Sequence, residues 1–390
     1  MANKKCIIPF AILLFLGLFT TGIYFLLNHH HKPPRSNHHQ SKSNTKLYNY
    51  NNTPILPNTN KYNSTRRTMM KFDVVVSKSG DEKFTTISEA ILSAPSYSSS
   101  KFFIRVRSGV YNETVTVPQN KTNIVLIGDG VDVTKITANH HPPQFTTSNS
   151  ATFCKAVFGD GFMAQDITFE NDAGGRSGQA VAVLCDANHT IFYKCKFLAY
   201  QDTLYAKYGT QYYRECDIYG TVDFVFGFAT AVFQKCNLYA RVLGSYQQVT
   251  YTAQGRQSLD EKSGFTMQGC NFTLEPKVDP VKLREGCTIT AFLGRPWFPY
   301  STVMVMESYL GKMINSSGWE EWDGNPNNNA TYLEYNNWGP GANSSNRIKW
   351  SGFKMLSNAN EAIPYTASHL IQGDEWIPKT GVPYNGRFLD

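Results

Sequence analysis

Short apolar runs alternate with polar residues along most of the chain, and the runs end at Gly, Asn or Asp. Examples are Phe102–Val106, Ile124–Ile127 and Val303–Met306. Runs of this length with this punctuation predict β-strands. Between Thr86 and Ala94 the apolar residues instead recur at helical spacing, so this segment predicts one short helix in an otherwise all-β domain.

The middle of the chain repeats itself at an interval of about twenty residues. Three copies have this interval, IFYKCKFLAYQD (Ile191–Asp202), QYYRECDIYGTVD (Gln211–Asp223) and AVFQKCNLYA (Ala231–Ala240), and a similar segment, FTMQGCNFT (Phe265–Thr273), follows further along. A fixed period in a strand-rich chain indicates a solenoid in which each coil covers the last. With strands, this favours a parallel β-helix. A β-sandwich with chance similarity between the segments is the alternative fold.

The N-terminal part of the chain lacks the short strand-like runs seen after Phe72. An apolar run, Ile7–Leu27, follows Lys4 and Lys5, and it is long enough to span a bilayer. Residues 1–28 are therefore predicted to be a signal peptide or an uncleaved single-pass signal anchor, and either one sends the chain into the secretory pathway. Residues 29–70, rich in Asn, His and Ser, predict a disordered linker. Residues 71–390 remain for the folded domain.

Composition and charge narrow the classes of function. The 41% of hydrophobic residues are enough for a large core. The net charge of +7 favours weak attraction to a polyanion without identifying it. The chain has no long Lys/Arg run and no nucleic-acid motif, so we do not expect a nucleic-acid partner. The spacing of Cys and His does not suggest zinc, and we expect no metal or cofactor.

Four segments carry chemically useful side chains at the spacing of the repeat. They are GQAVAV (Gly178–Val183), QDTLY (Gln201–Tyr205), DFVFG (Asp223–Gly227) and LGRPW (Leu293–Trp297). Gln179 and Gln201 are 22 residues apart, and Asp202 and Asp223 are 21 apart, so each step is about one coil. Side chains one coil apart lie roughly 4.8 Å apart. We therefore expect these amides and carboxylates to converge on one face.

Such a cluster could carry out acid and nucleophile chemistry together. Two close carboxylates cannot both ionise easily, so one pKa rises and the pair supplies an acid and a nucleophile. Side-chain amides can donate hydrogen bonds to a developing oxyanion. Arg295 can hold one Asp ionised, and Trp297 offers a flat face for a sugar ring. Taken singly, each residue could equally be a turn Asp, a surface amide or a packed aromatic.

These segments resemble the plant pectin methylesterases (pectinesterases), from about Phe72 to Tyr384. The shared motifs include GVYNETV (Gly109–Val115), IGDG (Ile127–Gly130), YRECDIYGTVDFVFG (Tyr213–Gly227), TAQGR (Thr252–Arg256), GPGANSSNRIKW (Gly339–Trp350) and IQGDEWIPKTGVPY (Ile371–Tyr384). The resemblance implies a right-handed parallel β-helix and a pectinesterase catalytic domain at residues 71–390. It implies an esterase that converts methyl-esterified homogalacturonan into pectate and methanol in the plant cell wall.

The resemblance also implies roles for particular residues. Asp223 matches the nucleophile, and Asp202 matches the proton donor that later acts as a base. Gln179 and Gln201 match the oxyanion-stabilising amides. Three further residues match substrate-binding positions: Arg295, Trp297 and Thr147.

The chain departs from the usual family pattern around these residues. The departures are Gly178, Leu184, the stretch Lys207–Thr210 and Thr302. They put subsite contacts and the pattern of attack in doubt, but they remove no catalytic position. Many plant members also carry an N-terminal inhibitor-like domain of about 150 residues, for which the segment before Phe72 is too short. The partners expected from the resemblance are pectin and a proteinaceous pectinesterase inhibitor, and we expect a secreted, monomeric cell-wall protein.

The cysteines of the repeats leave several arrangements open. Cys195, Cys216 and Cys236 occupy equivalent places in successive repeats, so stacking would bring neighbours within reach of a disulfide. Cys216–Cys236, Cys195–Cys216 and a ladder of unpaired thiols all fit the spacing. The resemblance favours the disulfide between Cys216 and Cys236.

Two other functions compete with the esterase. A glycoside hydrolase or lyase acting on pectin could use paired carboxylates on the same architecture, but it has no need of the two flanking Gln residues. A pectin-binding wall protein without activity would fit the departures from the family pattern. The intact Asp202, Asp223 and Arg295 argue against it.

Overall fold

The computed structural model describes residues 47–48, 70–153, 160–243, 246–276, 288–322 and 329–389. The predicted signal segment and nearly all of the predicted linker lie outside these residues. No helix among the described residues is long and apolar enough to cross a membrane. The described residues belong to the compact unit Thr45–Asp390.

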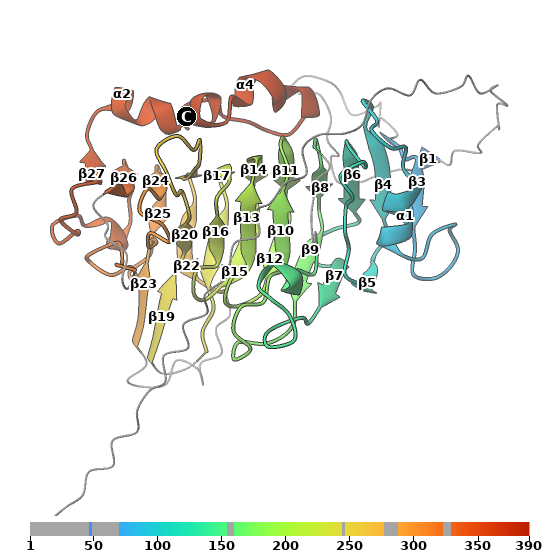
Figure 1. Cartoon of the computed structure of the whole chain (residues 1–390), viewed down its shortest axis with the longest axis horizontal. Helices are drawn as coiled ribbons and strands as arrows, with labels where there is room; N and C mark the ends of the chain where they lie inside the picture. The colour runs from blue at the N-terminus through green and yellow to red at the C-terminus, as the bar shows by residue number, and fades with distance from the viewer. Residues whose placement is uncertain are drawn as a thin grey trace, which may run out of the picture. The chain divides into compact units, whose positions relative to one another are not determined.

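Parallel strands stack into a β-helix, and three sheets form its sides (Figure 1). Eleven described strands form the largest sheet, in the order β27 (Phe353–Leu356), β26 (Thr331–Tyr335), β24 (Thr302–Met306), β21 (Gly264–Gln268), β17 (Thr230–Gln234), β14 (Thr210–Arg214), β11 (Thr190–Tyr193), β8 (Met163–Gln165), β6 (Ile124–Gly128), β4 (Phe102–Val106) and β3 (Val74–Val76). Because each strand pairs with its counterpart one coil away, the predicted right-handed parallel β-helix is confirmed.

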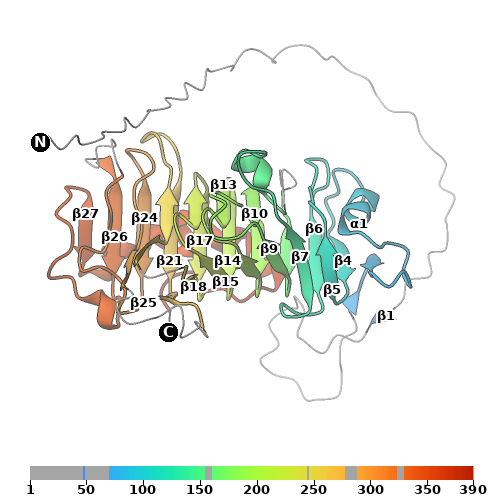
Figure 2. The same cartoon turned by 90° about the horizontal axis from the view of Figure 1, so that it is seen from below.

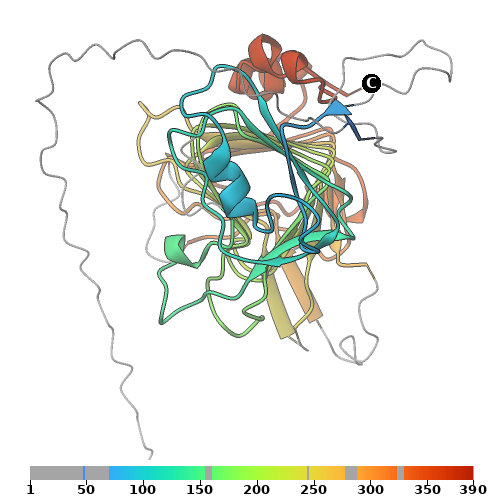
Figure 3. The same cartoon turned by 90° about the vertical axis from the view of Figure 1, so that its right-hand side faces the viewer.

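Two shorter sheets close the coils. Eight described strands form the second sheet, in the order β25 (Tyr309–Leu310), β22 (Asn271–Leu274), β18 (Asn237–Ala240), β15 (Asp217–Gly220), β12 (Lys196–Leu198), β9 (Thr168–Asn171), β7 (Thr134–Ala138) and β5 (Gly109–Asn112). Four described strands form the third sheet, in the order β10 (Val183–Asp186), β13 (Leu204–Tyr208), β16 (Val225–Gly227) and β20 (Thr252–Gln254). Figure 3 looks along the stack and shows the strands surrounding a common interior.

Two pairs lie beside these sheets. β19 (Tyr246–Thr250) pairs in parallel with β23 (Thr288–Phe292), and β1 (Leu47–Tyr48) pairs antiparallel with β2 (Met70–Lys71). The first of these pairs leads into the LGRPW segment.

The repeat seen in the sequence corresponds to one turn of backbone between the first and second sheets. Lys194, Glu215 and Lys235 directly precede the repeat cysteines, and all three adopt the left-handed conformation, with φ of 50°, 52° and 55°. One left-handed residue lets the chain turn sharply from one sheet into the next. The copies therefore share the order strand, left-handed residue, Cys, strand.

The interior of the coils is filled by aromatic residues stacked from coil to coil. The ring of Tyr213 lies 5.3 Å from that of Phe192 and 4.4 Å from that of Phe233, and all three rings are nearly parallel. These residues are fully buried. Since each coil presents the same ring at the same place, the stack also keeps the coils in register.

The structure does not contain the predicted Cys216–Cys236 disulfide, because both residues are free, buried thiols. Cys216 Sγ donates to the Phe192 carbonyl oxygen at 3.3 Å, and Cys236 Sγ donates to the Tyr213 carbonyl oxygen at 3.5 Å. Equivalent side chains on stacked strands point the same way at a spacing of about 4.8 Å, whereas the two Cβ atoms of a disulfide lie about 3.8 Å apart. The cysteines therefore form the ladder of unpaired thiols.

The predicted helix is confirmed as α1 (Ile87–Ser93), and Figure 2 shows it at the opposite end of the stack from β27. The Thr86 hydroxyl accepts a hydrogen bond from the Glu89 backbone N–H and so caps the first turn. Ile87, Ala90 and Ile91 are buried against the first coils. The helix therefore shields the apolar end of the solenoid from water.

The C-terminal segment adds helices that the sequence pattern did not predict. They are α2 (Ala359–Ala362), α3 (Ala367–Leu370) and α4 (Gly373–Trp376). Ile371 and Ile377 pack against residues of the eleven-strand sheet such as Ile191 and Tyr212. This segment therefore covers the outer, apolar face of that sheet.

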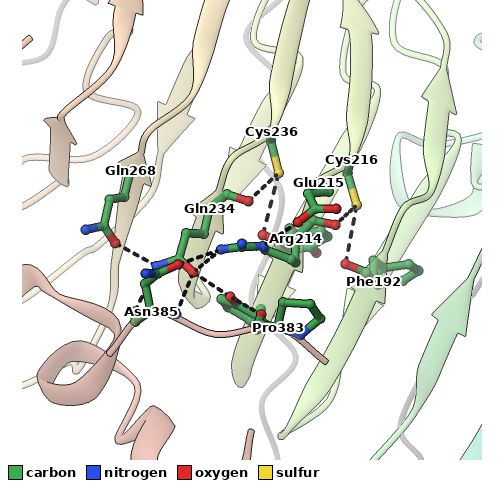
Figure 4. A network of polar contacts seen from close by, with 11 residues as sticks. Phe192, Arg214, Glu215, Cys216, Gln234, Cys236, Gln268, Pro383 and Asn385 are labelled. Carbon is green, nitrogen blue, oxygen red and sulfur yellow. Dashed lines mark hydrogen bonds and ion pairs between the residues drawn. The ribbon is translucent and has the colours of Figure 1, made fainter. Parts of the chain in front are cut away.

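Figure 4 shows the polar contacts that fasten the end of the chain to the same sheet. Arg214 Nη1 donates to Gln234 Oε1 at 2.6 Å and to Asn385 Oδ1 at 3.1 Å. Gln234 Nε2 donates to Gln268 Oε1 at 2.8 Å and to the Asn385 carbonyl oxygen at 2.9 Å. Because these side chains come from three successive coils, the tail links the coils together.

Candidate active site

The four-strand sheet brings the predicted site residues together. Gln179 and Gln201 form a parallel bridge on neighbouring coils. Asp202 lies two residues before Leu204 and Asp223 two residues before Val225, and Leu204 pairs with Val225 in the sheet. The two carboxylates therefore stack one coil apart, as the 21-residue step predicted.

Both aspartates have a left-handed backbone. Their φ angles are 63° for Asp202 and 51° for Asp223, a region that residues other than glycine seldom adopt. Hydrogen bonds between coils hold this conformation: the Asp202 N–H donates to the Val222 carbonyl oxygen at 3.1 Å, and the Leu204 N–H donates to the Phe224 carbonyl oxygen at 2.9 Å. Strained backbone that its surroundings hold in place is frequent at functional sites.

Arg295 aims the carboxylate of Asp223. Its Nε donates to Asp223 Oδ1 at 2.9 Å and its Nη2 donates to Oδ2 at 2.7 Å, which is the two-pronged geometry of a guanidinium on a carboxylate. The Arg295 guanidinium carbon also lies 4.2 Å from the centre of the Trp322 ring. A cation held between a carboxylate and an aromatic face has little freedom to turn.

The electrostatics separate the two carboxyl groups. Burial raises the pKa of Asp202 well above its usual value, and the neighbouring Asp223 carboxylate raises it further, against the opposing effect of Arg295. Burial raises the pKa of Asp223 as well, but its hydrogen bonds to Arg295 pull that pKa back down. Both pKa values are raised above that of a free aspartate, that of Asp202 well above it, which favours Asp202 as the proton donor and Asp223 as the nucleophile.

These residues line an open cleft of ≈ 590 Å³. Its described lining consists of Thr146, Thr147, Ser148, Gln179, Gln201, Asp202, Tyr205, Asp223, Phe226, Ala253, Arg295, Trp297 and Trp322. All seven residues predicted for catalysis or substrate binding are in this set. A few convergent polar groups between aromatic walls are typical of a ligand-binding cleft.

Three aromatic residues of the cleft had no role in the sequence analysis. Tyr205 and Phe226 lie three residues after the two aspartates, and their rings stack at 4.2 Å. Both residues stand in the QDTLY and DFVFG segments that carry the aspartates, and that was the available signal. Trp322 comes from an irregular segment far along the chain, and no sequence pattern marks it.

Two of the departures from the family pattern have structural roles. Gly178 adopts φ +75°, a conformation that suits glycine, and it directly precedes Gln179. Leu184 is buried beside Tyr205, its partner on the neighbouring strand, in the apolar cluster that also contains Phe226. Both leave the polar centre of the cleft intact.

The pectinesterase family model matches residues 73–374. The chain is 42% identical over 318 residues to pectinesterase/pectinesterase inhibitor PPE8B of Prunus persica, covering 81% of this chain and 60% of that protein. It is 46% identical over 314 residues to probable pectinesterase/pectinesterase inhibitor 32 of Arabidopsis thaliana, covering 80% and 58%. The chain thus spans about three fifths of the length of these curated relatives.

Solved structures agree with this match. Pectin methylesterase from carrot superposes with a TM-score of 0.77 at 39% identity, covering 84% of this chain and all of that one. A pectin methylesterase from Aspergillus niger superposes with a TM-score of 0.65 at 32% identity, covering 78% and 94%. The family model covers most of the chain and the fold agrees with these structures, so the chain belongs to the pectinesterase family.

Proposed function

We propose that the chain is a carboxylic ester hydrolase that demethylesterifies homogalacturonan to pectate and methanol. One observation carries the proposal: a buried carboxyl group, aimed by Arg295, lies one coil from a second buried carboxyl group whose pKa burial raises. A nucleophile and an acid are thereby present in the same cleft. The membership of the family supports this choice of substrate.

The first half-reaction forms an acyl-enzyme. An Asp223 oxygen attacks the carbonyl carbon of the methyl ester, and the side-chain amides of Gln179 and Gln201 donate to the resulting oxyanion. The tetrahedral intermediate then collapses, and its carbon–oxygen bond to methanol breaks. The departing oxygen takes the proton of Asp202, which leaves methanol, an anhydride at Asp223 and an ionised Asp202.

The second half-reaction restores the enzyme. Asp202, now a carboxylate, removes a proton from a water molecule as that water attacks the acyl carbon. The bond to Asp223 breaks, the galacturonate leaves as a free acid, and Asp202 is protonated again. The raised pKa of Asp202 suits a group that must alternate between acid and base.

The cleft walls fit a polysaccharide substrate. Trp297 and Tyr205 are positioned to contact sugar rings, and Thr147 lies at the start of the 3₁₀ turn Ser148–Ser150 on the cleft rim. Apolar ring faces suit the flat faces of a sugar, while Arg295 supplies charge at the reacting centre.

We also propose that the protein works outside the cell, in the plant cell wall, after Ile7–Leu27 has directed it into the secretory pathway. A proteinaceous pectinesterase inhibitor is the proposed protein partner, and the proposed oligomeric state is a monomer. Size-exclusion chromatography of the secreted protein, with and without such an inhibitor, tests the last two points.

Purified protein incubated with highly methyl-esterified pectin tests the activity. The proposal predicts methanol release and a fall in pH while the polymer length stays constant. Shortening of the chain without methanol release would instead identify a glycoside hydrolase or lyase. Neither change, in protein shown to be folded, would indicate a binding protein.

A further inference from the structure

Strand β13 contains a bulge that changes the direction of its last side chain. Leu184 pairs with Tyr205 and Cys185 pairs with Ala206, but Asp186 pairs with Tyr208, so Lys207 is an extra residue on β13. Side chains along a strand alternate between the two faces. Without the extra residue, Tyr208 would point the opposite way to Tyr205. The bulge turns it back to the outer face, where the cleft lies.

The neighbours of Tyr208 hold this arrangement. Gly209 has φ +82°, and a Cβ atom there would lie 2.3 Å from the Ala187 carbonyl oxygen, so the turn after the bulge requires glycine. Lys207 Nζ forms an ion pair with Asp186 Oδ2 at 2.9 Å. Lys207 and Gly209 belong to the Lys207–Thr210 stretch, in which the chain departs from the usual family pattern, and Asp186 contacts this stretch.

The result is an exposed aromatic platform. The Tyr208 side chain is 48% exposed, and its ring stacks on that of Phe228 at 5.3 Å with an angle of 20° between the planes. The Phe228 N–H donates to the Lys207 carbonyl oxygen at 3.0 Å, which fixes the two strands side by side. Lys207 Nζ also lies 5.6 Å from the centre of the Tyr208 ring, and the part of the ring that stays open to water is suited to contact with another flat group.

The platform continues the aromatic wall of the active-site cleft. The Phe228 ring lies 4.8 Å from the Trp297 ring, which lies 6.0 Å from the Phe226 ring in the cleft. Tyr208 is the last residue of β13 and lies six residues beyond Asp202 in the sequence. A row of rings therefore leads from the reacting centre to the end of β13.

A second hollow, of ≈ 320 Å³, lies at this end of the row. Tyr208, Phe228 and Thr230 line it, together with Lys262 and Glu261, whose charges are opposite. Because these charges cancel, the hollow has no strong preference for an anion. The ring faces are the features that fit a sugar, because the Thr230 hydroxyl already donates to the Lys262 carbonyl oxygen.

We propose that Tyr208 and Phe228 form an outlying subsite that stacks a galacturonosyl residue of the pectin chain, beyond the sugar whose ester is cleaved. The inference rests on the proposed function, since it extends the same substrate along the same wall. Occupation of this subsite strengthens binding of long chains and leaves the chemistry at Asp223 unchanged.

Methanol release from methyl-esterified oligogalacturonates of graded length tests the proposal in Tyr208→Ala. For the parent protein, kcat/KM should rise with length until the oligomer reaches the platform. In Tyr208→Ala the last part of this rise should disappear. For the longest oligomers kcat/KM should fall about three- to tenfold, because KM rises while kcat stays the same. Tyr208→Trp should keep the rise, because it retains a stacking face. Trp338→Ala, which removes a 60% exposed ring packed on Tyr309 outside the cleft, is the matched control.

The outcomes separate this inference from the proposed function. If the parent releases methanol and the length profile of Tyr208→Ala coincides with that of the parent, the subsite is refuted. An equal loss on the shortest and longest oligomers also refutes it, because Tyr208 would then act through the fold or the reacting centre. Absence of methanol from every oligomer with the folded parent refutes the proposed function itself. The stacking contribution should persist in high salt, and its disappearance there would show that charge, not ring contact, is responsible.

Discussion

Arg295→Ala should shift the pH dependence of the esterase more than it lowers stability. Asp223 must be ionised to attack, so the rate rises with pH as this carboxyl group loses its proton. Arg295 opposes the effect of burial on the pKa of Asp223 through two hydrogen bonds of 2.9 and 2.7 Å. Removing the guanidinium therefore raises that pKa and moves the acid limb of the pH–rate profile to higher pH.

The size of the shift follows from the geometry. An opposite charge at this distance lowers the pKa of an aspartate by about 1–3 units. The acid limb should therefore move upward by about 1–3 units, and at a pH below it the rate falls about tenfold for each unit. Arg295→Lys should restore part of the shift, since it supplies the charge. It should not restore kcat, because a point charge cannot align both carboxylate oxygens.

Initial rates of methanol release across a pH series, with thermal unfolding of the same samples, measure both effects. Arg105→Ala is the matched control, because it removes an Arg–carboxylate contact of 2.9 Å with Asp129, away from the cleft. It should leave the pH profile where it is. An acid limb that stays in place in Arg295→Ala, with protein shown to be folded, would refute the assignment of Asp223 as the group that Arg295 holds ionised.

Three further predictions concern Asp202, the buried ion pair and the thiols. The pKa of Asp202 in the folded state lies well above 3.8, so the folded protein holds this proton to higher pH than the unfolded chain does, and stability falls as pH rises from about 4 towards the folded-state pKa. Asp202→Asn should remove that fall and raise the melting temperature at pH 7. A melting temperature of the parent protein that stays constant from pH 4 to 8 would contradict this prediction. Arg347 donates from Nε to the fully buried Glu334 at 2.8 Å. Arg347→Met leaves this carboxylate buried without its partner, so the free energy of unfolding, measured in urea, should fall by about 3–5 kcal/mol. A fall below about 1 kcal/mol would show that Glu334 is not left as an unpaired buried charge. Cys216 and Cys236 should resist a thiol reagent in the native protein and react after denaturation, whereas a disulfide-linked Cys216–Cys236 peptide in non-reducing mapping would restore the pairing that the structure lacks.

The fold could be predicted from the sequence because one short motif recurs in successive coils. Each repeat carries a left-handed residue before its cysteine, as at Lys194 and Glu215, and the chain turns from one sheet to the next at this residue. The stacked site followed from the same period, since Asp202 and Asp223 differ by one coil. A period visible in the sequence therefore predicts which side chains meet across coils.

Contacts between residues that do not occupy equivalent places in neighbouring coils could not be predicted in the same way. Trp322 reaches Arg295 from an irregular segment, and only the folded chain brings the two together. The bulge at Lys207 has no marker apart from the glycine that follows it. Spacing alone does not separate stacked thiols from a disulfide, because both place the two cysteines one coil apart.

The C-terminal helices escaped prediction for a different reason. Each has four residues, which is too short to show a helical period in the sequence. They are held by tertiary contacts, such as those of Ile371 and Ile377 with the eleven-strand sheet. Local propensity therefore carries little information about this part of the chain.

Methanol release by Asp223→Asn tests the central claim most directly. The substitution keeps the size and shape of the side chain but removes the negative charge needed for attack on the ester. The account predicts that the variant, shown by circular dichroism to be folded and by calorimetry still to bind oligogalacturonate, releases no methanol from methyl-esterified pectin. Release at the rate of the parent protein would contradict the assignment of Asp223 as the nucleophile.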